Sequence, residues 1–190
     1  MIQEQDSPDP QAPGAFTVVY STDDRYAWLA GISMESLLQR HRGVETLEVV
    51  VLDNAVSSVN RQKLLATAAR YGRPLRFIDV VESLARLQSL KVSTYSSISI
   101  YARFFVADLL PEISGRILYL DCDTLVCDRL DDLLSLPMQG MPIGMILDCL
   151  RNEYKRVIGL PENAPYYNSG VLLIDLERWR LARCKERIIE

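Results

Sequence analysis

The feature that most constrains this chain is an apolar, strand-forming run that ends at two carboxylates. Ile117 to Leu120 is uncharged and mostly apolar, and Asp121 and Asp123 follow it directly. In an extended chain, side chains two residues apart point to the same face. The two carboxylates are therefore expected to lie together at the carboxyl edge of a buried strand, where open α/β sheets bind ligands. Like charges this close repel unless a cation lies between them, and oxygen ligands favour a hard divalent ion. The simpler alternative is a turn or a helix N-cap.

Strand-like and helix-like segments alternate along the rest of the chain. Strands are predicted at residues 16–20, 47–52, 74–80, 143–147 and 166–174, and helices at 27–42, 57–71, 99–110, 128–136 and from 177 onwards. Asp128 is the expected cap of the helix at 128–136. Residues 82–98 suggest a short helix followed by a Ser-rich polar loop. The alternation predicts an α/β fold with a doubly wound, mostly parallel sheet flanked by helices.

Length and composition are those of one domain. The chain has 190 residues, of which 48% are hydrophobic, enough for a core. Residues 1–14 are polar and Pro-rich, so a disordered lead-in is expected before a domain at 15–190. The net charge is −4 and the basic residues are scattered, which argues against a nucleic-acid partner. No run approaches the ~18 apolar residues of a membrane span, and no signal peptide is evident. We therefore expect a cytoplasmic protein.

The cysteines do not form a metal motif. Cys122, Cys127, Cys149 and Cys184 show neither CxxC pairing nor zinc-type spacing, and His41 is the sole histidine. Reduced, buried thiols are the usual state for such cysteines in a cytoplasmic protein.

Several other polar residues fall at expected strand ends or in an apolar helix. These are Asp23, Asp148, Asn168 and Arg103. Each has a simpler explanation: the aspartates can be turn formers, Arg103 can extend to solvent, and Asn168 can belong to a bulge. Their joint placement at one edge of the sheet predicts a single site.

Four motifs in this order resemble glycosyltransferase family 8: STDDRY, SIYARFF, ILYLDCDTLV and YYNSGVLLIDLERWR. That family includes bacterial lipopolysaccharide galactosyl- and glucosyltransferases and glycogenin, and the resemblance covers residues 16 to about 185. It implies a GT-A fold, a UDP-sugar donor such as UDP-galactose or UDP-glucose, and Mn²⁺ or Mg²⁺ as cofactor. It also implies transfer to a saccharide or glycolipid acceptor with retention of anomeric configuration.

The resemblance assigns the nucleotide and metal contacts. Asp121 and Asp123 would bind the metal that bridges the donor diphosphate, a Lewis-acid and template role. The other implied nucleotide contacts are Tyr20, Thr22, Asp23, Arg25, Tyr26 and Cys122. Among these, Arg25 stands where relatives often carry Asn.

The resemblance also implies a sugar side of the site. Arg103 would approach the donor, while Asp148 and Asn168 would lie around the transferred sugar as the catalytic region. Hydrogen bonds from such residues can select one hexose epimer over another.

The family extends beyond Glu190, and its further part carries a metal-ligating histidine in a His-x-x-Gly stretch. His41 does not match that position, so the resemblance implies a chain that lacks its C-terminal part. A catalytically incomplete UDP-sugar-binding module is therefore an alternative to an active transferase. Another alternative is a haloacid-dehalogenase-type phosphatase with Asp121 as nucleophile, although Leu125 stands where that pattern has Thr or Val.

The expected final helix is both apolar and basic. Trp179, Leu181 and Ile188 alternate with basic residues. Its apolar side can pack on the sheet while the basic residues face solvent. The alternative is peripheral contact with the inner face of an anionic membrane, where a lipid acceptor would be found. In either case, exposed apolar surface is expected at this end of the chain.

Overall fold

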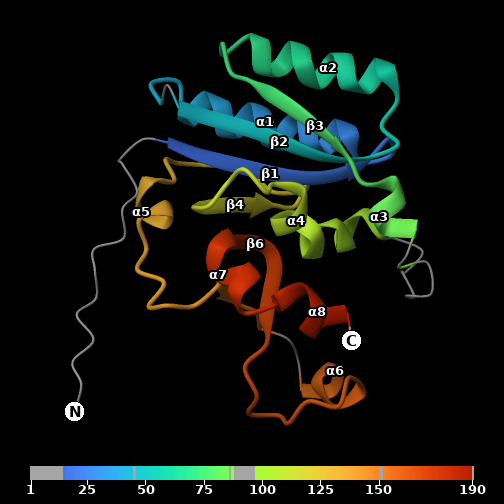
Figure 1. Cartoon of the computed structure of the whole chain (residues 1–190), viewed down its shortest axis with the longest axis vertical. Coiled ribbons are helices and arrows are strands. Elements are labelled where there is room, and N and C mark those ends of the chain that lie inside the picture. Colours follow the sequence, from blue (N-terminus) through green and yellow to red (C-terminus); the bar gives the residue numbers. More distant parts are fainter. Residues whose placement is uncertain (1–14, 45, 86, 88–96, 150–151, 190) are drawn as a thin grey trace.

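A computed structural model describes residues 15–44, 46–85, 87, 97–149 and 152–189 (Figure 1). The expected lead-in at residues 1–14 and most of the Ser-rich loop lie outside the described residues. The molecule is elongated, with α2 (Ser58–Ala69) at one end and α6 (Asn152–Val157) at the other.

The strands are β1 (Ala15–Asp23), β2 (Thr46–Asn54), β3 (Leu75–Asp79), β4 (Arg116–Leu120), β5 (Ile143–Leu147) and β6 (Tyr167–Asp175). The remaining helices are α1 (Ala27–Arg40), α3 (Val81–Ala85), the 3₁₀ helix η1 (Ile98–Phe105), α4 (Val106–Leu109), α5 (Asp131–Leu134), α7 (Leu176–Leu181) and α8 (Cys184–Ile189). Every predicted strand is present, whereas α6 has no counterpart among the predicted helices.

The strands form one sheet in the order β3-β2-β1-β4-β6-β5. β1 pairs in parallel with both β2 and β4, and β2 pairs in parallel with β3. β6 runs antiparallel to β4 and to β5. The expected α/β class with a mostly parallel sheet is confirmed. The chain leaves β1 towards β2 and returns on the other side as β4, so the carboxyl ends of β1 and β4 flank a topological switch point.

Helices cover both faces of the sheet, and the alternation of side chains along β4 separates the two cores. Leu118 and Leu120 pack with α1 and α2 on one face. Ile117 and Tyr119 pack with η1, α4 and α7 on the other. Because Tyr119 faces η1, a side chain two residues further on is directed to the same helix.

The predicted helix at 99–110 is present, but most of it is 3₁₀ and only Val106–Leu109 is α-helical. Two carbonyls near its start accept side-chain hydrogen bonds, one from β1 and one from within the helix itself. Ser99 O accepts from Ser21 Oγ at 2.7 Å, and Ile100 O accepts from Arg103 Nε at 2.6 Å. These bonds engage carbonyls that an α-helix would pair with its own backbone N–H groups. Runs of 3₁₀ helix this long are uncommon and often mark functional segments.

The predicted final helix is also wrong, because it is divided into α7 and α8. Arg183, between them, has a left-handed φ of 51°. Trp179 is buried, whereas Leu181 is 78% exposed, so the chain does not form one amphipathic face. Among the described helices, none is long and apolar enough to cross a bilayer.

Two further expectations are corrected. Asp128 does not cap a helix: α5 begins at Asp131 after Leu130, and the Asp128 carboxylate accepts from the N–H of Arg129. Of the four thiols only Cys122 is buried, because Cys127 and Cys149 lie on exposed loops and Cys184 is half-buried.

Candidate functional site

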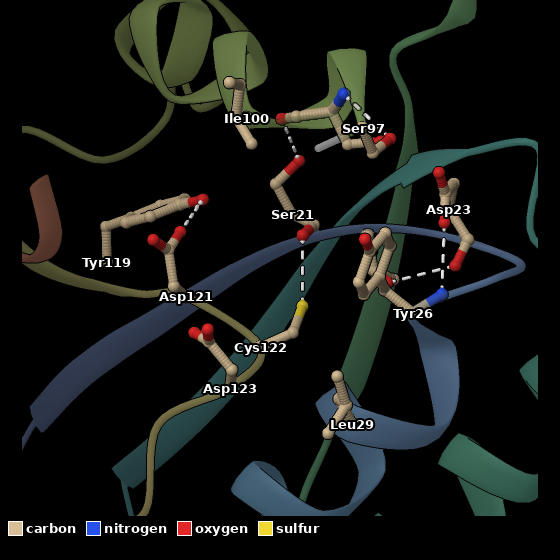
Figure 2. Close-up of a pocket in the computed structure, with 12 residues that line it drawn as sticks. Ser21, Asp23, Tyr26, Leu29, Ser97, Ile100, Tyr119, Asp121, Cys122 and Asp123 are labelled. Carbon is tan, nitrogen blue, oxygen red and sulfur yellow. Dashed lines mark hydrogen bonds between the residues drawn. The ribbon is translucent and has the colours of Figure 1, made fainter. Parts of the chain in front are cut away.

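A pocket of about 240 Å³ lies where β1 and β4 end (Figure 2). It is lined by residues from the β1 end, α1, η1 and the β4 end: Ser21, Thr22, Asp23, Tyr26, Leu29, Ser97, Ser99, Ile100, Tyr119, Asp121, Cys122 and Asp123. Pairing of Tyr20 with Leu120 brings the two strand ends side by side, and the thiol of Cys122 donates to Ser21 O at 3.2 Å. The pocket therefore occupies the switch point of the sheet.

The Asp-x-Asp motif forms a turn at this edge. β4 ends at Leu120, and both the backbone N–H and the hydroxyl of Thr124 donate to Asp121 O, at 3.2 and 2.8 Å. From the sequence, an extended chain is expected here, whereas the motif forms a turn. Both carboxylates nevertheless lie on one side of the loop (Figure 2). Burial raises the pKa of the Asp121 carboxyl, and the neighbouring charge of Asp123 adds to this effect while Arg103 opposes it.

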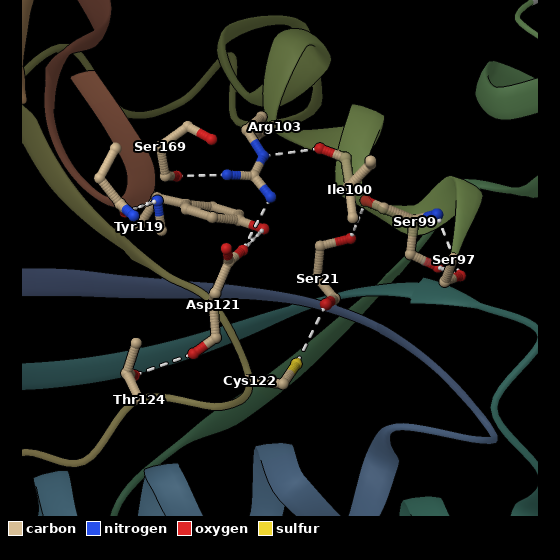
Figure 3. Close-up of polar contacts among 12 residues, drawn as sticks. Ser21, Ser97, Ser99, Ile100, Arg103, Tyr119, Asp121, Cys122, Thr124 and Ser169 are labelled. Atoms are coloured by element: carbon tan, nitrogen blue, oxygen red, sulfur yellow. Dashed lines mark hydrogen bonds and ion pairs between the residues drawn. The ribbon is translucent and has the colours of Figure 1, made fainter. Parts of the chain in front are cut away.

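Arg103 is fixed against the motif rather than extended to solvent. Only 5% of the residue is exposed, and its Nη2 donates to Asp121 Oδ1 at 2.7 Å. Its Nη1 donates to Ser169 O, and its guanidinium lies 4.6 Å from the ring centroid of Tyr119 (Figure 3). A buried cation at this position partly neutralises Asp121 and holds it in one orientation.

The loop after β1 supplies the opposite wall. Asp23 accepts from the N–H of Tyr26 at 3.1 Å, so it shapes the turn as well as lining the pocket. Thr22 also lines the pocket. Arg25 does not: it is exposed, and its guanidinium carbon lies 5.3 Å from the ring centroid of Tyr26. Tyr20 is fully buried beneath α1 and accepts from Ser33, away from the pocket lining.

Asp148 and Asn168 meet beside Asp121, outside the pocket lining. The amide of Asn168 donates to Asp148 Oδ2 at 3.4 Å, and its Oδ1 accepts from the N–H of Gly170 at 2.7 Å. A Cβ at Gly170 would lie 3.0 Å from both Asn168 Oδ1 and Asp121 Oδ2. A bulge is present at this point, because the pairing of β5 with β6 jumps from Leu172 to Asn168 between successive β5 residues and skips Ser169–Val171. The bulge brings the amide to the carboxylates.

Some lining residues were not identified from the sequence. Ser97 belongs to the Ser-rich stretch at 82–98 and Ser99 begins the predicted helix at 99–110, but neither was singled out. Their hydroxyls bond each other at 2.9 Å. Tyr119 reads as an ordinary strand residue. The spacing of two between Tyr119 and Asp121 is the signal that places both on the face of η1.

The oxygen atoms at the motif fit a divalent cation that is bound partly by the protein and partly by the substrate. Asp121 and Asp123 offer oxygen atoms only, and Gly170 leaves open space where a side chain would crowd Asp121 Oδ2. Within the described residues no group of three or more His, Cys, Asp or Glu side chains could hold a metal ion. Two carboxylates are sufficient for Mg²⁺ or Mn²⁺ when phosphate and water supply the other ligands.

Comparison with known proteins points to one family. The model of the family described as Glycosyl transferase family 8 matches residues 17–190. General stress protein A of Bacillus subtilis is 27% identical over 90% of this chain and 60% of its own. Lipopolysaccharide 1,3-galactosyltransferase of Salmonella typhimurium is 26% identical over 92% of this chain and 52% of its own.

A solved structure agrees with these sequence matches. The galactosyltransferase LgtC, solved with donor and acceptor sugar analogues, superposes with a TM-score of 0.76 at 31% identity. The match covers 87% of this chain and 60% of LgtC. The chain thus spans about half to three-fifths of the length of these relatives.

Proposed function

The chain belongs to glycosyl transferase family 8, and from this we propose that it transfers a hexose, galactose or glucose, from a UDP-sugar to a saccharide or lipopolysaccharide acceptor. The observation that supports this proposal best is the pocket at the β1–β4 switch point, which joins a nucleoside-sized space to two carboxylates. The phosphatase alternative finds no support, since the family is that of a transferase and Asp121 is held by Arg103.

One group of residues would bind the nucleotide and its metal, and another would bind the sugar. Thr22, Asp23 and Tyr26 hold the uracil and ribose, with their backbone fixed by the turn that Asp23 forms. Asp121 and Asp123 would hold Mn²⁺ or Mg²⁺ against the donor diphosphate. Bound there, the ion supplies Lewis-acid stabilisation of the departing UDP.

The sugar side consists of Asp148 and Asn168, which bond each other and lie next to Asp121 through Gly170. Their hydrogen bonds to ring hydroxyls orient the hexose and select its epimer. Arg103 keeps Asp121 in place. The hexose is transferred with retention, and an oxygen of the donor β-phosphate accepts the acceptor's proton on the leaving-group face.

A second candidate is a module that binds UDP-sugar without turnover. It is favoured by the ligand set, because among the described residues no group of three or more His, Cys, Asp or Glu side chains could hold a metal ion. The same binding contacts serve both candidates, so affinity alone does not separate them.

Two measurements test these functions. Titration calorimetry of UDP, ADP and GDP, each with Mn²⁺ and with EDTA, tests the donor site. We expect UDP to bind most tightly and Mn²⁺ to strengthen its binding, because a site built for uracil leaves polar groups unpaired against a purine. Equal affinity for the three nucleotides, or no effect of metal, would contradict the donor assignment.

The second measurement is turnover of UDP-galactose and UDP-glucose with saccharide and lipopolysaccharide acceptors, followed by NMR of the product's anomeric proton. An α-linked product from the α-linked donor supports retention, and an inverted linkage excludes it. Binding without release of UDP from either donor identifies the non-catalytic module.

A further inference from the structure

We propose that Tyr119 is a positioning residue for the metal-binding carboxylate Asp121, fixing the oxygen Oδ2 towards the pocket and Gly170. The inference rests on the proposed function, because it concerns how this chain presents Asp121 to a divalent ion and the donor diphosphate. It assigns a role to a strand residue that had no place in the sequence motifs.

The phenol and the carboxylate are joined directly. Tyr119 is 1% exposed in β4, and its hydroxyl donates to Asp121 Oδ1 at 3.0 Å. An ionised carboxylate only accepts hydrogen bonds, so the phenol is the donor in this pair. The spacing of two residues favours the contact. Tyr119 faces η1 from β4, and Asp121, just past the strand end, is directed to the same side, where it meets Arg103 of η1.

Two donors converge on one oxygen of Asp121. Arg103 Nη2 approaches Oδ1 at 2.7 Å alongside the Tyr119 hydroxyl (Figure 3). Such a pair of donors fixes the rotation of the carboxylate, which a single bond would leave freer. The other oxygen, Oδ2, then lies against Gly170, where a Cβ would come within 3.0 Å. Oδ2 is thereby the oxygen available to an ion.

The ring of Tyr119 has a separate effect. The Arg103 guanidinium lies 4.6 Å from the ring centroid, which is cation–π geometry. Replacing Tyr119 by Phe keeps the ring under Arg103 and removes only the bond to Asp121. This substitution therefore isolates the positioning role from the packing of the core.

A purely structural role is the competing explanation, and the chain contains a matched control. Tyr20, in the neighbouring strand β1, is also fully buried, and its hydroxyl accepts from Ser33 Oγ at 3.2 Å. Tyr20 lies in the core under α1, does not line the pocket and bonds neither carboxylate. It reaches the Asp-x-Asp turn only indirectly, because Ser33 Oγ also bonds the hydroxyl of Thr124 at 3.0 Å. Tyr20→Phe thus removes a buried hydroxyl without touching Asp121.

The test is a titration of Mn²⁺ into each variant in the presence of UDP, followed by electron paramagnetic resonance of free Mn²⁺. Loss of a hydrogen bond behind a metal ligand typically weakens metal binding 10–100-fold. We expect Tyr119→Phe to weaken Mn²⁺ binding about tenfold, at the low end of that range, and Tyr20→Phe to change it less than about twofold. UDP affinity in EDTA and the unfolding temperature should remain close to those of the parent chain in both variants.

The outcomes distinguish failure of the Tyr119 inference from failure of the proposed donor site. If the parent binds UDP with Mn²⁺ dependence and Tyr119→Phe binds Mn²⁺ as tightly, Tyr119 is structural and the inference is wrong. It is equally wrong if Tyr20→Phe weakens Mn²⁺ binding as much as Tyr119→Phe does, or if Tyr119→Phe lowers the unfolding temperature far more than Tyr20→Phe. If the parent shows no Mn²⁺-dependent UDP binding, the proposed donor site itself fails.

Discussion

The thiol of Cys122 donates to the backbone oxygen of Ser21, 3.2 Å away, and ties the Asp-x-Asp turn to the end of β1. These residues are 101 positions apart in the chain. Their contact closes the wall of the pocket between the nucleotide loop and the carboxylates. It also removes the thiol from solvent, and burial raises the pKa of Cys122 to about 12.

This environment predicts low reactivity at Cys122. The thiolate is the reactive species, and its population at Cys122 stays small at any pH well below about 12. Iodoacetamide at pH 8 should therefore modify the exposed Cys127 and Cys149 first, and Cys122 should react only after unfolding in denaturant. Peptide mass spectrometry gives the order of modification. Rapid labelling of Cys122 in the folded chain would contradict a closed pocket wall.

Removing the charge of Asp123 should abolish the effect of metal on nucleotide binding. Asp123 is exposed at the pocket, so Asn is accommodated there without repacking. We expect Asp123→Asn to bind UDP with the same affinity in Mn²⁺ and in EDTA, as measured by calorimetry. Asp128→Asn is the control, because Asp128 is also exposed, does not line the pocket and accepts from its neighbour's N–H further along the same loop. A metal effect that survives in Asp123→Asn argues against the two-carboxylate site.

A methyl group at Gly170 should disturb the site more than the fold. Its Cβ would lie 3.0 Å from Asp121 Oδ2 and from Asn168 Oδ1, tighter than most real Cβ contacts, so both side chains would have to shift. We expect Gly170→Ala to weaken Mn²⁺-dependent UDP binding by about tenfold or more, since ligand displacement has effects of that size. Gly144→Ala is a matched control in β5, where the new Cβ would meet Leu173 at an ordinary 3.5 Å. Equal UDP affinity in the two variants would show that Gly170 is not needed for space.

Arg180 should contribute strongly to stability through its carbonyl partners. Its guanidinium donates to Ala107 O, Leu110 O and Ile113 O at 2.7–3.1 Å, which anchors α7 beside α4. Arg180→Met removes this donor from all three carbonyls, although Leu110 O keeps the N–H of Ile113 at 3.1 Å. The expected cost is about 2–4 kcal/mol. For a chain of this size that corresponds to a fall of roughly 5–10 °C in the unfolding temperature.

The control for Arg180 is Arg178→Met. Arg178 is about half exposed and pairs with Asp175, an ion pair of small expected value. Differential scanning calorimetry should show a much smaller change for this variant. Similar unfolding temperatures for both variants would mean that the α4–α7 anchor contributes little.

The strands and the position of the Asp-x-Asp motif could be predicted because each depends on a local pattern. The run before Asp121 is apolar on both faces, and the sheet buries it on both faces. The 3₁₀ form of η1 could not be predicted in this way. It depends on Ser21, which lies 78 positions from the carbonyl of Ser99 that it bonds.

The arrangement of the site was predictable only in part. Arg103 was recognised as unusual in an apolar helix, but its partner Asp121 and the Tyr119 ring come from another element. The role of Gly170 was also hidden, because it depends on two oxygens brought together by antiparallel pairing of β6. Such effects require the tertiary structure, since they involve contacts between elements rather than patterns within one.

The reversed direction of β6 has a consequence for how such proteins diversify. The parallel strands β1 and β4 present the nucleotide pocket with their last residues, whereas β6 reaches the same edge with its first residues. The segment between β5 and β6, which carries α6, therefore leaves from and returns to the sugar side. Under the proposed function, changes of length or sequence in the segment between β5 and β6 can give new sugar and acceptor preferences. The nucleotide pocket at the ends of β1 and β4 would not be altered by such changes.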